Sequence, residues 1–227
     1  MRKTIFALLC FAIAATGVKA QDMNVYLDHI SHQKSIQLNF GTQGVGAEFA
    51  SGLTPNLAIR AGVNFIPVTM NNAVHISGLQ SETKLTASFS NIHLLADFTP
   101  FTRAPFFRLV GGAAYFVQAK GGFEIQPTGN YTYGDIVLTQ DQVGKVNMNA
   151  DWSGIAPYVG FGLIKVFPKN RFNVNLDLGS YYLNRPQTTI IGTGLLDGNS
   201  SQNGQFQQNI SSYRFLPVLQ LNFNFKL

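Results

Sequence analysis

Hydrophobic and polar residues alternate along several segments of the chain. The last nine residues, LQLNFNFKL (219–227), place Leu, Leu, Phe, Phe and Leu on one side and Gln, Asn, Asn and Lys on the other. A period of two predicts a β-strand with one apolar and one polar face. The same design recurs along the chain at 44–50, 57–68, 91–98, 107–118, 155–167 and 172–183. The sequence therefore predicts an all-β domain.

The connections between these segments alternate between short and long. The short turns contain Pro with Asn, Gly or Thr, as in SGLTPN (51–56), TPFTRAP (99–105) and PKNR (168–171). The long polar connections cover 70–84, 119–153 and 184–212. Short periplasmic turns and long external loops are typical of outer-membrane barrels. The final strand should then run towards the periplasm, and the connection 119–153 should form a hairpin above the membrane.

Bacterial barrels of this type have an even number of strands, so an eighth is required. A strand inserted within 119–153 would reverse the direction of every later strand and break the alternation of short and long connections. We expect it instead at 23–30, rising to an external turn, with 35–50 as one descending strand. The predicted fold is an antiparallel up-and-down transmembrane β-barrel of eight strands, in which the final strand closes against the first.

The N-terminus has the composition of a secretory signal peptide. Arg2 and Lys3 precede the apolar run TIFALLCFAIAATGV, and the small residues of VKA (18–20) follow it. We predict a cleaved signal peptide at 1–20 and a single outer-membrane β-barrel domain at 21–227. The alternative is an N-terminal membrane anchor, for which the run is short. Cleavage would remove Cys10, the only cysteine, so that the mature chain has no disulfide.

Charge is scarce in this chain. Cleavage would remove Arg2, Lys3 and Lys19, which leaves 13 basic against 11 acidic residues. No basic run or stripe is present, so a nucleic-acid partner is not expected. Charged residues make up 12% of the chain, against about a quarter in a soluble domain. Low charge with alternation suits a barrel whose outer surface faces lipid, and no apolar stretch is long enough for a transmembrane helix.

The charges that do occur fall on the inner faces of the predicted strands. Glu48 and Arg60 are equidistant from residue 54, so the hairpin would set them opposite each other, and Asp97 and Arg108 bracket the next turn. The predicted interior polar network consists of Glu48, Arg60, His93, Asp97, Arg108 and Asp177, with Asn173 and Asn175 beside it. An eight-stranded barrel is only wide enough for side chains, so we predict a sealed core. A substrate-binding or ion-conducting lining is the alternative.

The sequence predicts no catalytic, cofactor-binding or metal site. The four histidines have no metal-ligand spacing with a carboxylate. GTGLLDG (192–198) precedes no helical pattern, so phosphate binding is rejected. A His–Ser pair for a lipid hydrolase could be drawn from His75 with Ser77 or Ser81, but chance supplies such pairs. Aromatic residues near predicted strand ends suggest an interfacial girdle: Tyr115, Trp152, Tyr158, Tyr181 and Tyr182.

The segments GVGAEFASGLTPNLAIRAGVNF, APYVGFGL, FNVNLDLG and LPVLQLNFNFKL resemble those of small outer-membrane β-barrel proteins of Gram-negative bacteria. The nearest resemblance is to OmpX- and OmpW-like barrels of Bacteroidota. The resemblance implies this fold and an outer-membrane location but no single function. Such barrels usually end in Phe or Trp, whereas this chain ends in Leu227, with Phe225 two residues before it on the same face.

We therefore expect a monomeric, non-enzymatic outer-membrane protein in contact with lipid. Its role would be structural, or surface interaction through its loops, or a minor passage or binding of small apolar molecules. One alternative is a lipid-modifying outer-membrane enzyme. Another is a soluble exported lipocalin-like barrel, in which Glu48, Arg60, Asp97 and Arg108 would lie on the outside.

Overall fold

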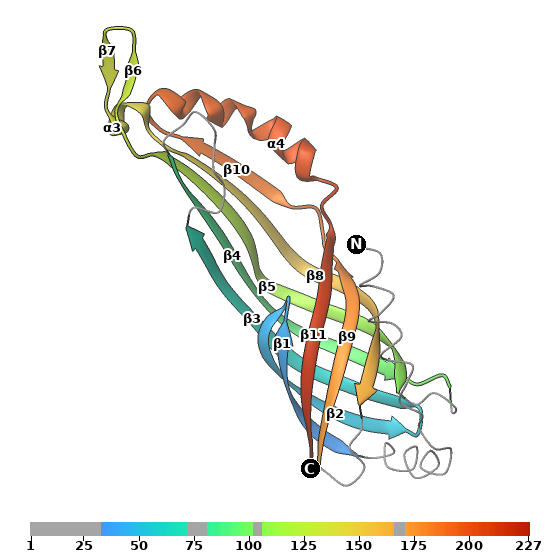
Figure 1. Cartoon of the computed structure of the whole chain (residues 1–227). Coiled ribbons are helices and arrows are strands. Elements are labelled where there is room, and N and C mark those ends of the chain that lie inside the picture. Colours follow the sequence, from blue (N-terminus) through green and yellow to red (C-terminus); the bar gives the residue numbers. More distant parts are fainter. Residues whose placement is uncertain (1–32, 72–80, 102–105, 166–170) are drawn as a thin grey trace, which may run out of the picture.

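The computed structural model describes residues 33–71, 81–101, 106–165 and 171–227. Eight antiparallel strands form a closed ring in which each pairs with the next and the last pairs with the first (Figure 1). They are β1 (Lys34–Gly41), β2 (Gly44–Thr54), β3 (Leu57–Asn71), β4 (Ser81–Phe98), β5 (Phe107–Pro127), β8 (Val146–Lys165), β9 (Phe172–Tyr182) and β11 (Phe215–Lys226). The predicted eight-stranded up-and-down barrel is confirmed, as is the closure of the final strand against the first.

The two ends of the barrel differ. The end that holds the C-terminus, here called the lower end, carries the connections between β2 and β3, β4 and β5, and β8 and β9 (Figure 1). The upper end carries the hairpin of β6 (Tyr131–Tyr133) and β7 (Ile136–Leu138), followed by α3 (Gln140–Val143). β10 (Gln187–Gly192) pairs with the upper part of β8, and η2 (Gly194–Gln202) and α4 (Asn203–Ile210) follow it. The hairpin predicted within 119–153 is therefore present, but β5 and β8 occupy much of that segment and leave 128–145 as the connection.

The start of the barrel differs from the prediction. Residues 1–32, which hold the predicted signal peptide and the predicted strand at 23–30, lie outside the described residues. The expectation of one descending strand at 35–50 was wrong, because the chain reverses at Thr42 and Gln43 to give ascending β1 and descending β2. Gly44 has a φ of 82°, which favours glycine. The reversal contains no Pro, Asn or Asp, but Gly41 and Gly44 flank it, and the apolar positions change phase from Phe40 to Val45. These two signals of a turn were not used in the prediction.

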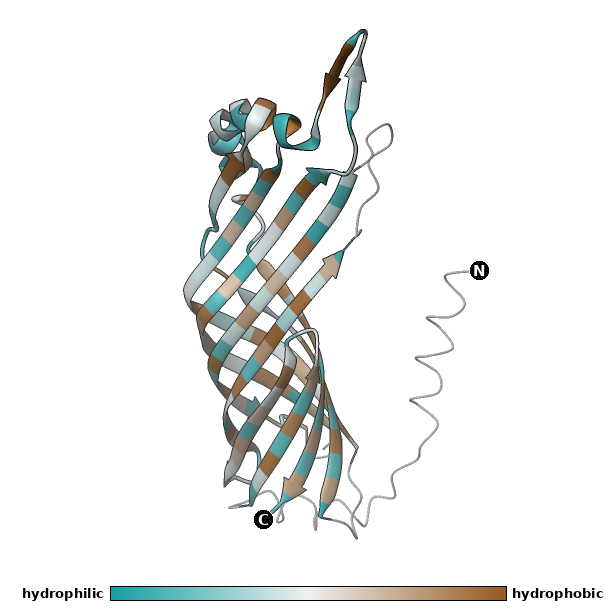
Figure 2. Ribbon diagram, turned by 90° about the vertical axis from the view of Figure 1, so that its left-hand side faces the viewer, coloured by the Kyte–Doolittle hydropathy of each residue, from teal (hydrophilic) through white to brown (hydrophobic). Residues whose placement is uncertain are grey.

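The outward faces of the strands are apolar through the lower part of the barrel. Figure 2 shows hydrophobic and hydrophilic residues alternating along the strands there. The outward side chains are well exposed, up to 72% for Val159. They include Ile36, Leu38, Phe40, Val45, Phe49, Val63, Phe65, Ile92, Leu94, Leu109, Ile155, Leu219, Leu221 and Phe223. Within the described ranges, no helix has the length and hydropathy needed to cross a membrane.

The wall of the barrel is lower on one side than elsewhere. β1 ends at Gly41 and β2 begins at Gly44, whereas β3 and β11 continue above the turn between them (Figure 1). From Ile66 upward, β3 pairs with β4 alone among the described strands, and β11 above Gln220 pairs with β9 alone. A gap in the sheet, here called the side opening, therefore separates β3 from β11 above the β1–β2 turn.

Candidate functional site

The structure places all six residues of the predicted polar network inside the barrel. Glu48 comes from β2, Arg60 from β3, His93 and Asp97 from β4, Arg108 from β5 and Asp177 from β9. All six are buried, and the side chain of Arg60 has no exposed surface. Successive side chains of a strand point to opposite faces of the sheet. These six residues occupy the positions in their strands that point into the lumen.

Arg60 stands at the centre of the network. Its Nη1 atom lies 2.8 Å from Glu48 Oε2 and 3.0 Å from Asp177 Oδ2, and its Nε atom lies 2.9 Å from Asp97 Oδ2. Arg108 forms a second bridge, with Nη1 2.7 Å from Asp97 Oδ2 and Nη2 2.6 Å from Asp177 Oδ1. Two guanidinium groups thus connect three carboxylates from three different strands, which gives short charge-assisted hydrogen bonds.

Neutral side chains complete the coordination of the carboxylates. Asn39 and Gln220 donate to Glu48 Oε1 at 2.7 and 3.0 Å, and Asn222 donates to Asp177 Oδ2 at 2.8 Å. His93 Nε2 lies 3.3 Å from Glu48 Oε1. Because buried charges are costly unless they are paired and hydrogen-bonded, this density of partners explains how a charged core is tolerated. Two of these hydrogen-bond donors, Gln220 and Asn222, come from the polar face of the C-terminal strand β11.

The pairings differ in register from the prediction. Glu48 lies opposite Gly62, and Arg60 lies opposite Ala50. The turn is centred on Pro55 and Asn56, between the paired residues Thr54 and Leu57, and the pairing shifts by one residue between Gly52 and Thr54. Across the next hairpin, Asp97 lies opposite Val110, two residues from Arg108. Both acid–arginine pairs are therefore diagonal, a separation that a long side chain can span.

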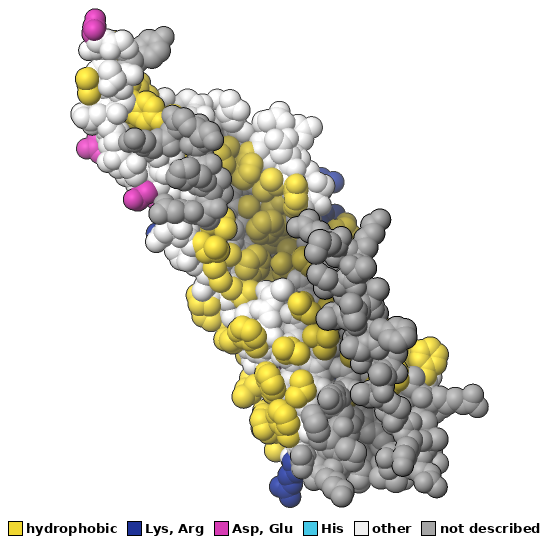
Figure 3. All heavy atoms as spheres, viewed as in Figure 1, with side chains coloured by type: hydrophobic (Ala, Val, Ile, Leu, Met, Phe, Trp, Pro, Cys, Tyr) yellow, Lys and Arg dark blue, Asp and Glu magenta, His cyan; other side chains and the backbone are white. Residues whose placement is uncertain are grey.

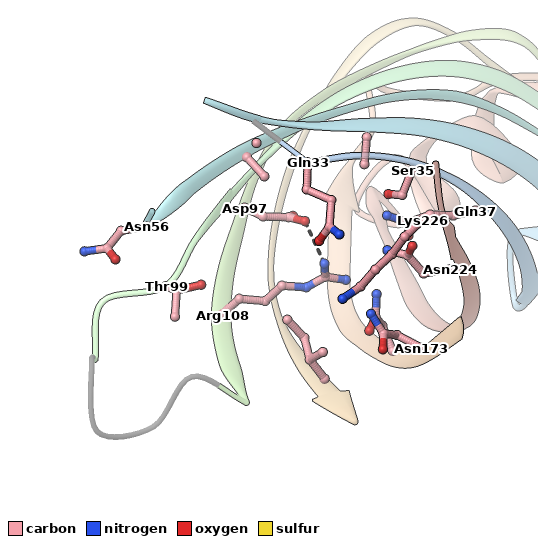
Figure 4. Close-up of a pocket in the computed structure, with 15 residues that line it drawn as sticks. Gln33, Ser35, Gln37, Asn56, Asp97, Thr99, Arg108, Asn173, Asn224 and Lys226 are labelled. Carbon is pink, nitrogen blue, oxygen red and sulfur yellow. Dashed lines mark hydrogen bonds and ion pairs between the residues drawn. The ribbon is translucent and has the colours of Figure 1, made fainter. Parts of the chain in front are cut away.

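Below the network lies a small recess of about 90 Å³, lined mainly by polar side chains. Figure 4 shows Arg108 and Asp97 pointing toward each other within it, with Asn173, Asn224 and Lys226 on the opposite side. The ion-paired core is thus the inner wall of the recess, and it separates the lower end of the barrel from the interior above.

Above the network lies a layer of buried aromatic and aliphatic side chains. The ring of Tyr181 packs edge-on against Phe116, with centroids 5.4 Å apart, and lies 4.7 Å from the ring of Tyr158. Phe116 is 1% exposed. The layer also contains Val110, Ala114, Ala119, Ala156, Leu183 and Val218. The expectation that Tyr158 and Tyr181 belong to an interfacial girdle was wrong, because both rings point into the lumen.

The upper part of the barrel holds a cavity of about 570 Å³, here called the apolar cup. Figure 3 shows hydrophobic side chains gathered around a hollow in the upper half of the molecule. Trp152, expected at the membrane interface, lines this cup instead. None of the described residues that line it carries a charge, and they include Leu85, Phe89, Phe123, Met148, Ala150, Leu183, Ile210, Tyr213 and Leu216.

The polar and apolar faces of the strands exchange sides at the level of the aromatic layer. Below it the outer face is apolar and the inner face polar, and above it the reverse holds. Along β4, the outward residues change from Ile92 and Leu94 to Ser88 and Ser90, while the inward ones change from His93 to Phe89. Along β5, an extra residue near Val117 shifts the register, so that Phe116 and Ala119 both point inward. Above this level, the outer surface carries the ion pairs Lys120–Asp151 and Lys145–Glu124.

Sequence reasoning missed the cup because it assigned residues 70–84 and 119–153 to loops. The signal was present in KLTASFS (84–90), where the alternation continues with the opposite phase from NIHLLADF (91–98). A strand whose two faces exchange their chemistry has no single apolar face along its length, so a search for one continuous amphipathic pattern ends at the exchange.

The placement of charges bears on the alternatives. A lipocalin-like barrel would carry Glu48, Arg60, Asp97 and Arg108 outside, which does not fit their burial in the lumen. Of the lipid-hydrolase pair, His75 and Ser77 lie outside the described residues. No group of three His, Cys, Asp or Glu side chains within the described ranges is arranged to hold a metal ion.

Comparisons with known proteins give likeness of structure. No protein-family model and no curated protein matches the chain. Among solved structures, CarO2 of Acinetobacter baumannii is 20% identical, with a TM-score of 0.64 over 86% of this chain and 98% of that one. CarO of the same organism is 21% identical, with a TM-score of 0.62 over 84% and 96%. A major outer membrane protein from Thermus thermophilus is 13% identical, with a TM-score of 0.44 over 86% and 98%. At this identity, the likeness to the two Acinetobacter structures shows a shared barrel fold.

Proposed function

We propose that this protein is a monomeric, non-enzymatic barrel of the bacterial outer membrane that forms no open pore and binds a small apolar molecule in its upper half. The observation that carries the proposal is the division of the interior into a charged, paired core below and an uncharged apolar cup above. A conducting channel needs a continuous polar path, and a purely structural barrel needs no cavity.

Several features support the outer-membrane location. The outward rows of the lower strands form an apolar band, which would be unstable in water and is stable against lipid chains. Polar and paired charged residues replace that band on the upper parts of β4, β5 and β8. The lower end, with its shorter connections, would then face the periplasm, and the β6–β7 hairpin and α4 would lie outside the cell.

Two successive layers support the absence of a pore. Arg60 and Arg108 cross-link carboxylates from different strands, and the aromatic layer of Phe116, Tyr158 and Tyr181 closes the lumen directly above. An ion would have to displace short ion pairs and then cross an apolar layer, both of which are energetically costly.

The size and lining of the cup support an apolar ligand. Its volume of about 570 Å³ falls within the range of roughly 300–1,000 Å³ that is typical of small-molecule sites. The described lining is aromatic and aliphatic, with Asn209 and Tyr213 among its few polar groups. Such a site would bind an uncharged apolar molecule and would exclude ions.

Trp152 provides a direct test, because it is the only tryptophan and it lines the cup. The purified protein in detergent would be titrated with the apolar fluorophore N-phenyl-1-naphthylamine, and energy transfer from Trp152 would report binding. A Cβ added at Gly121 would lie 3.7 Å from the Trp152 ring, so Gly121→Phe should fill the cup and weaken binding by about tenfold or more.

The matched control is Lys120→Phe, which places the same side chain on the adjacent residue. Lys120 points outward and its ion pair with Asp151 is exposed, so this variant should bind the fluorophore like the wild type. Equal binding by the wild type and Gly121→Phe, or no energy transfer in the wild type, would refute the proposed function.

A further inference from the structure

We infer that the cup is loaded through the side opening between β3 and β11, and that its occupant is a hydrocarbon chain that enters from the outer leaflet of the membrane. This inference rests on the proposed function and adds the source of the ligand and its route. It would make the barrel a receptor for membrane-dissolved amphiphiles.

The side opening interrupts the wall of paired strands above the β1–β2 turn. Around the rest of the ring, β4, β5 and β8 rise well above the level of the β1–β2 turn, and β10 continues the pairing with β8. At the level of the cup, the described strands leave unpaired backbone edges on β3 and β11 at the side opening, and on the side of β10 away from β8. The edge of β10 is partly satisfied by α4, where Thr188 N donates to Gln207 Oε1 at 2.9 Å. An unpaired edge in a barrel wall is unusual, because closure normally removes edges.

Both edges of the side opening carry a proline at a position where an N–H group would point into it. On β11, Pro217 O accepts from Thr42 Oγ1 at 3.1 Å, so the backbone of Pro217 faces the opening. On β3, the carbonyl of Phe65 lies against Gly44 of β2. Since backbone direction alternates along a strand, the nitrogen of Pro67 points to the same side as Phe65. Proline on an edge strand prevents further pairing, so the sequence keeps this gap from closing by sheet extension.

The lower margin of the side opening is held by the β1–β2 turn. Thr42 N donates to Leu219 O at 2.9 Å, and Leu219 N donates to Thr42 Oγ1 at 3.0 Å. With the bond to Pro217, three hydrogen bonds anchor the turn to β11 and satisfy the backbone groups that the end of β1 would leave free. The turn is therefore fixed in place and forms the lower edge of the side opening.

Apolar side chains line the path from the outer surface to the cup. Phe65 and Leu219 point outward on the two flanks and are 49% and 48% exposed. On the inner face of β3, Val68 and Met70 follow the parity of buried Asn64 and are 41% and 52% exposed, although they point into the barrel.

The same path continues into the cup on both flanks. Met70 pairs with Leu85 and Ile66 pairs with Phe89, and both partners line the cup. On the other flank, Phe215 and Leu216 of β11 line it directly. A chain entering here would exchange lipid contacts for protein contacts without crossing water, whereas a charged solute would find no partner among the described lining residues.

The experiment uses the full mature protein in lipid nanodiscs that contain phosphatidylcholine brominated on its acyl chains. Bromine quenches tryptophan fluorescence only at close contact, so quenching of Trp152 reports a lipid chain inside the cup. We expect strong quenching in the wild type and its loss in Val68→Lys, which places a charge on the inner rim. Thr69→Lys, the adjacent and outward-facing residue, should retain the quenching.

A second arm distinguishes the source of the chain. A brominated fatty acid would be added to nanodiscs of unbrominated lipid. Quenching in both arms would identify bilayer lipid as an occupant of the cup, and quenching with the fatty acid alone would identify a free amphiphile. Either pattern would support side entry of a hydrocarbon chain if Val68→Lys abolishes the quenching.

Binding of the naphthylamine fluorophore in detergent serves as the folding control for Val68→Lys. If the fluorophore binds the wild type but neither brominated compound quenches Trp152, or if Val68→Lys leaves quenching unchanged, side entry is wrong and the proposed function stands. If the fluorophore does not bind the wild type at all, the proposed function itself fails.

Discussion

Arg60 and Asp177 form an ion pair across the full width of the barrel. Arg60 Nη1 lies 3.0 Å from Asp177 Oδ2, and their strands, β3 and β9, stand on opposite sides of the eight-stranded ring. One side chain therefore spans the lumen and ties together walls that are far apart in the sheet. Asp97 of β4 pairs with Arg60, and Arg108 of β5 pairs with both Asp97 and Asp177, so that four strands are joined by ion pairs through the lumen.

Removing Arg60 should open the lower barrier to ions. In planar bilayers we expect the wild type to show little conductance and Arg60→Ser to show discrete channel openings, because the lumen loses its central side chain and retains three carboxylates. Lys120→Ser, which changes an outward and exposed residue, serves as the control. A large and steady conductance in the wild type would contradict the sealed core.

The aromatic layer should act as a second barrier in series. Phe116→Ala alone should conduct little, since the ion pairs remain, whereas Arg60→Ser combined with Phe116→Ala should conduct more than Arg60→Ser alone. Single-channel recording measures both. Equal conductance of the single Arg60→Ser and the double variant would show that the layer of Phe116, Tyr158 and Tyr181 contributes no resistance.

The network should also contribute to stability. Arg60→Met leaves Glu48, Asp97 and Asp177 with fewer cationic partners, and breaking a buried pair costs about 3–5 kcal/mol. Urea-induced unfolding from lipid vesicles, followed by Trp152 fluorescence, measures the difference. Lys145→Met breaks the partly exposed pair with Glu124 and should cost less than about 1 kcal/mol. Similar losses in the two variants would contradict this account.

Gly62 should be required opposite Glu48. A Cβ at this position would lie 2.5 Å from Glu48 Cγ, so Gly62→Leu should displace Glu48 from Arg60 and destabilise the barrel by about 1–3 kcal/mol through overpacking. Gly198→Leu is the matched control, since a Cβ there meets no heavy atom within 4 Å. The same unfolding measurement applies, and unchanged stability of Gly62→Leu would show that the network can rearrange.

The predictable part of this protein is local. Alternation with a period of two identified the β-strands of the lower barrel and the face on which Glu48, Arg60, Asp97, Arg108 and Asp177 lie, because side-chain direction in a strand depends only on parity. The scarcity of charge and the unequal connections indicated a closed barrel with lipid outside, since both follow from the solvent on each side of the wall.

Three features required the tertiary structure. The partners of each charge depend on ring closure and register. The turn at Pro55 and Asn56, together with the irregularity at Gly52–Thr54, leaves Arg60 two residues from its expected position opposite Glu48. The reversal at Thr42 and Gln43, between the alternation that ends at Phe40 and the one that begins at Val45, was established by the pairing of β1 with β2. The cup exists because strands exchange the chemistry of their faces above Asn91 while β1 and β2 stop short.

The physical reason is the same for all three. Parity is a property of one strand, so the sequence by itself determined which side chains enter the lumen. Which of them meet, and where the wall is left open, depend on how many residues each strand contributes before it ends. The relative lengths and register of neighbouring strands are fixed only when the whole sheet closes.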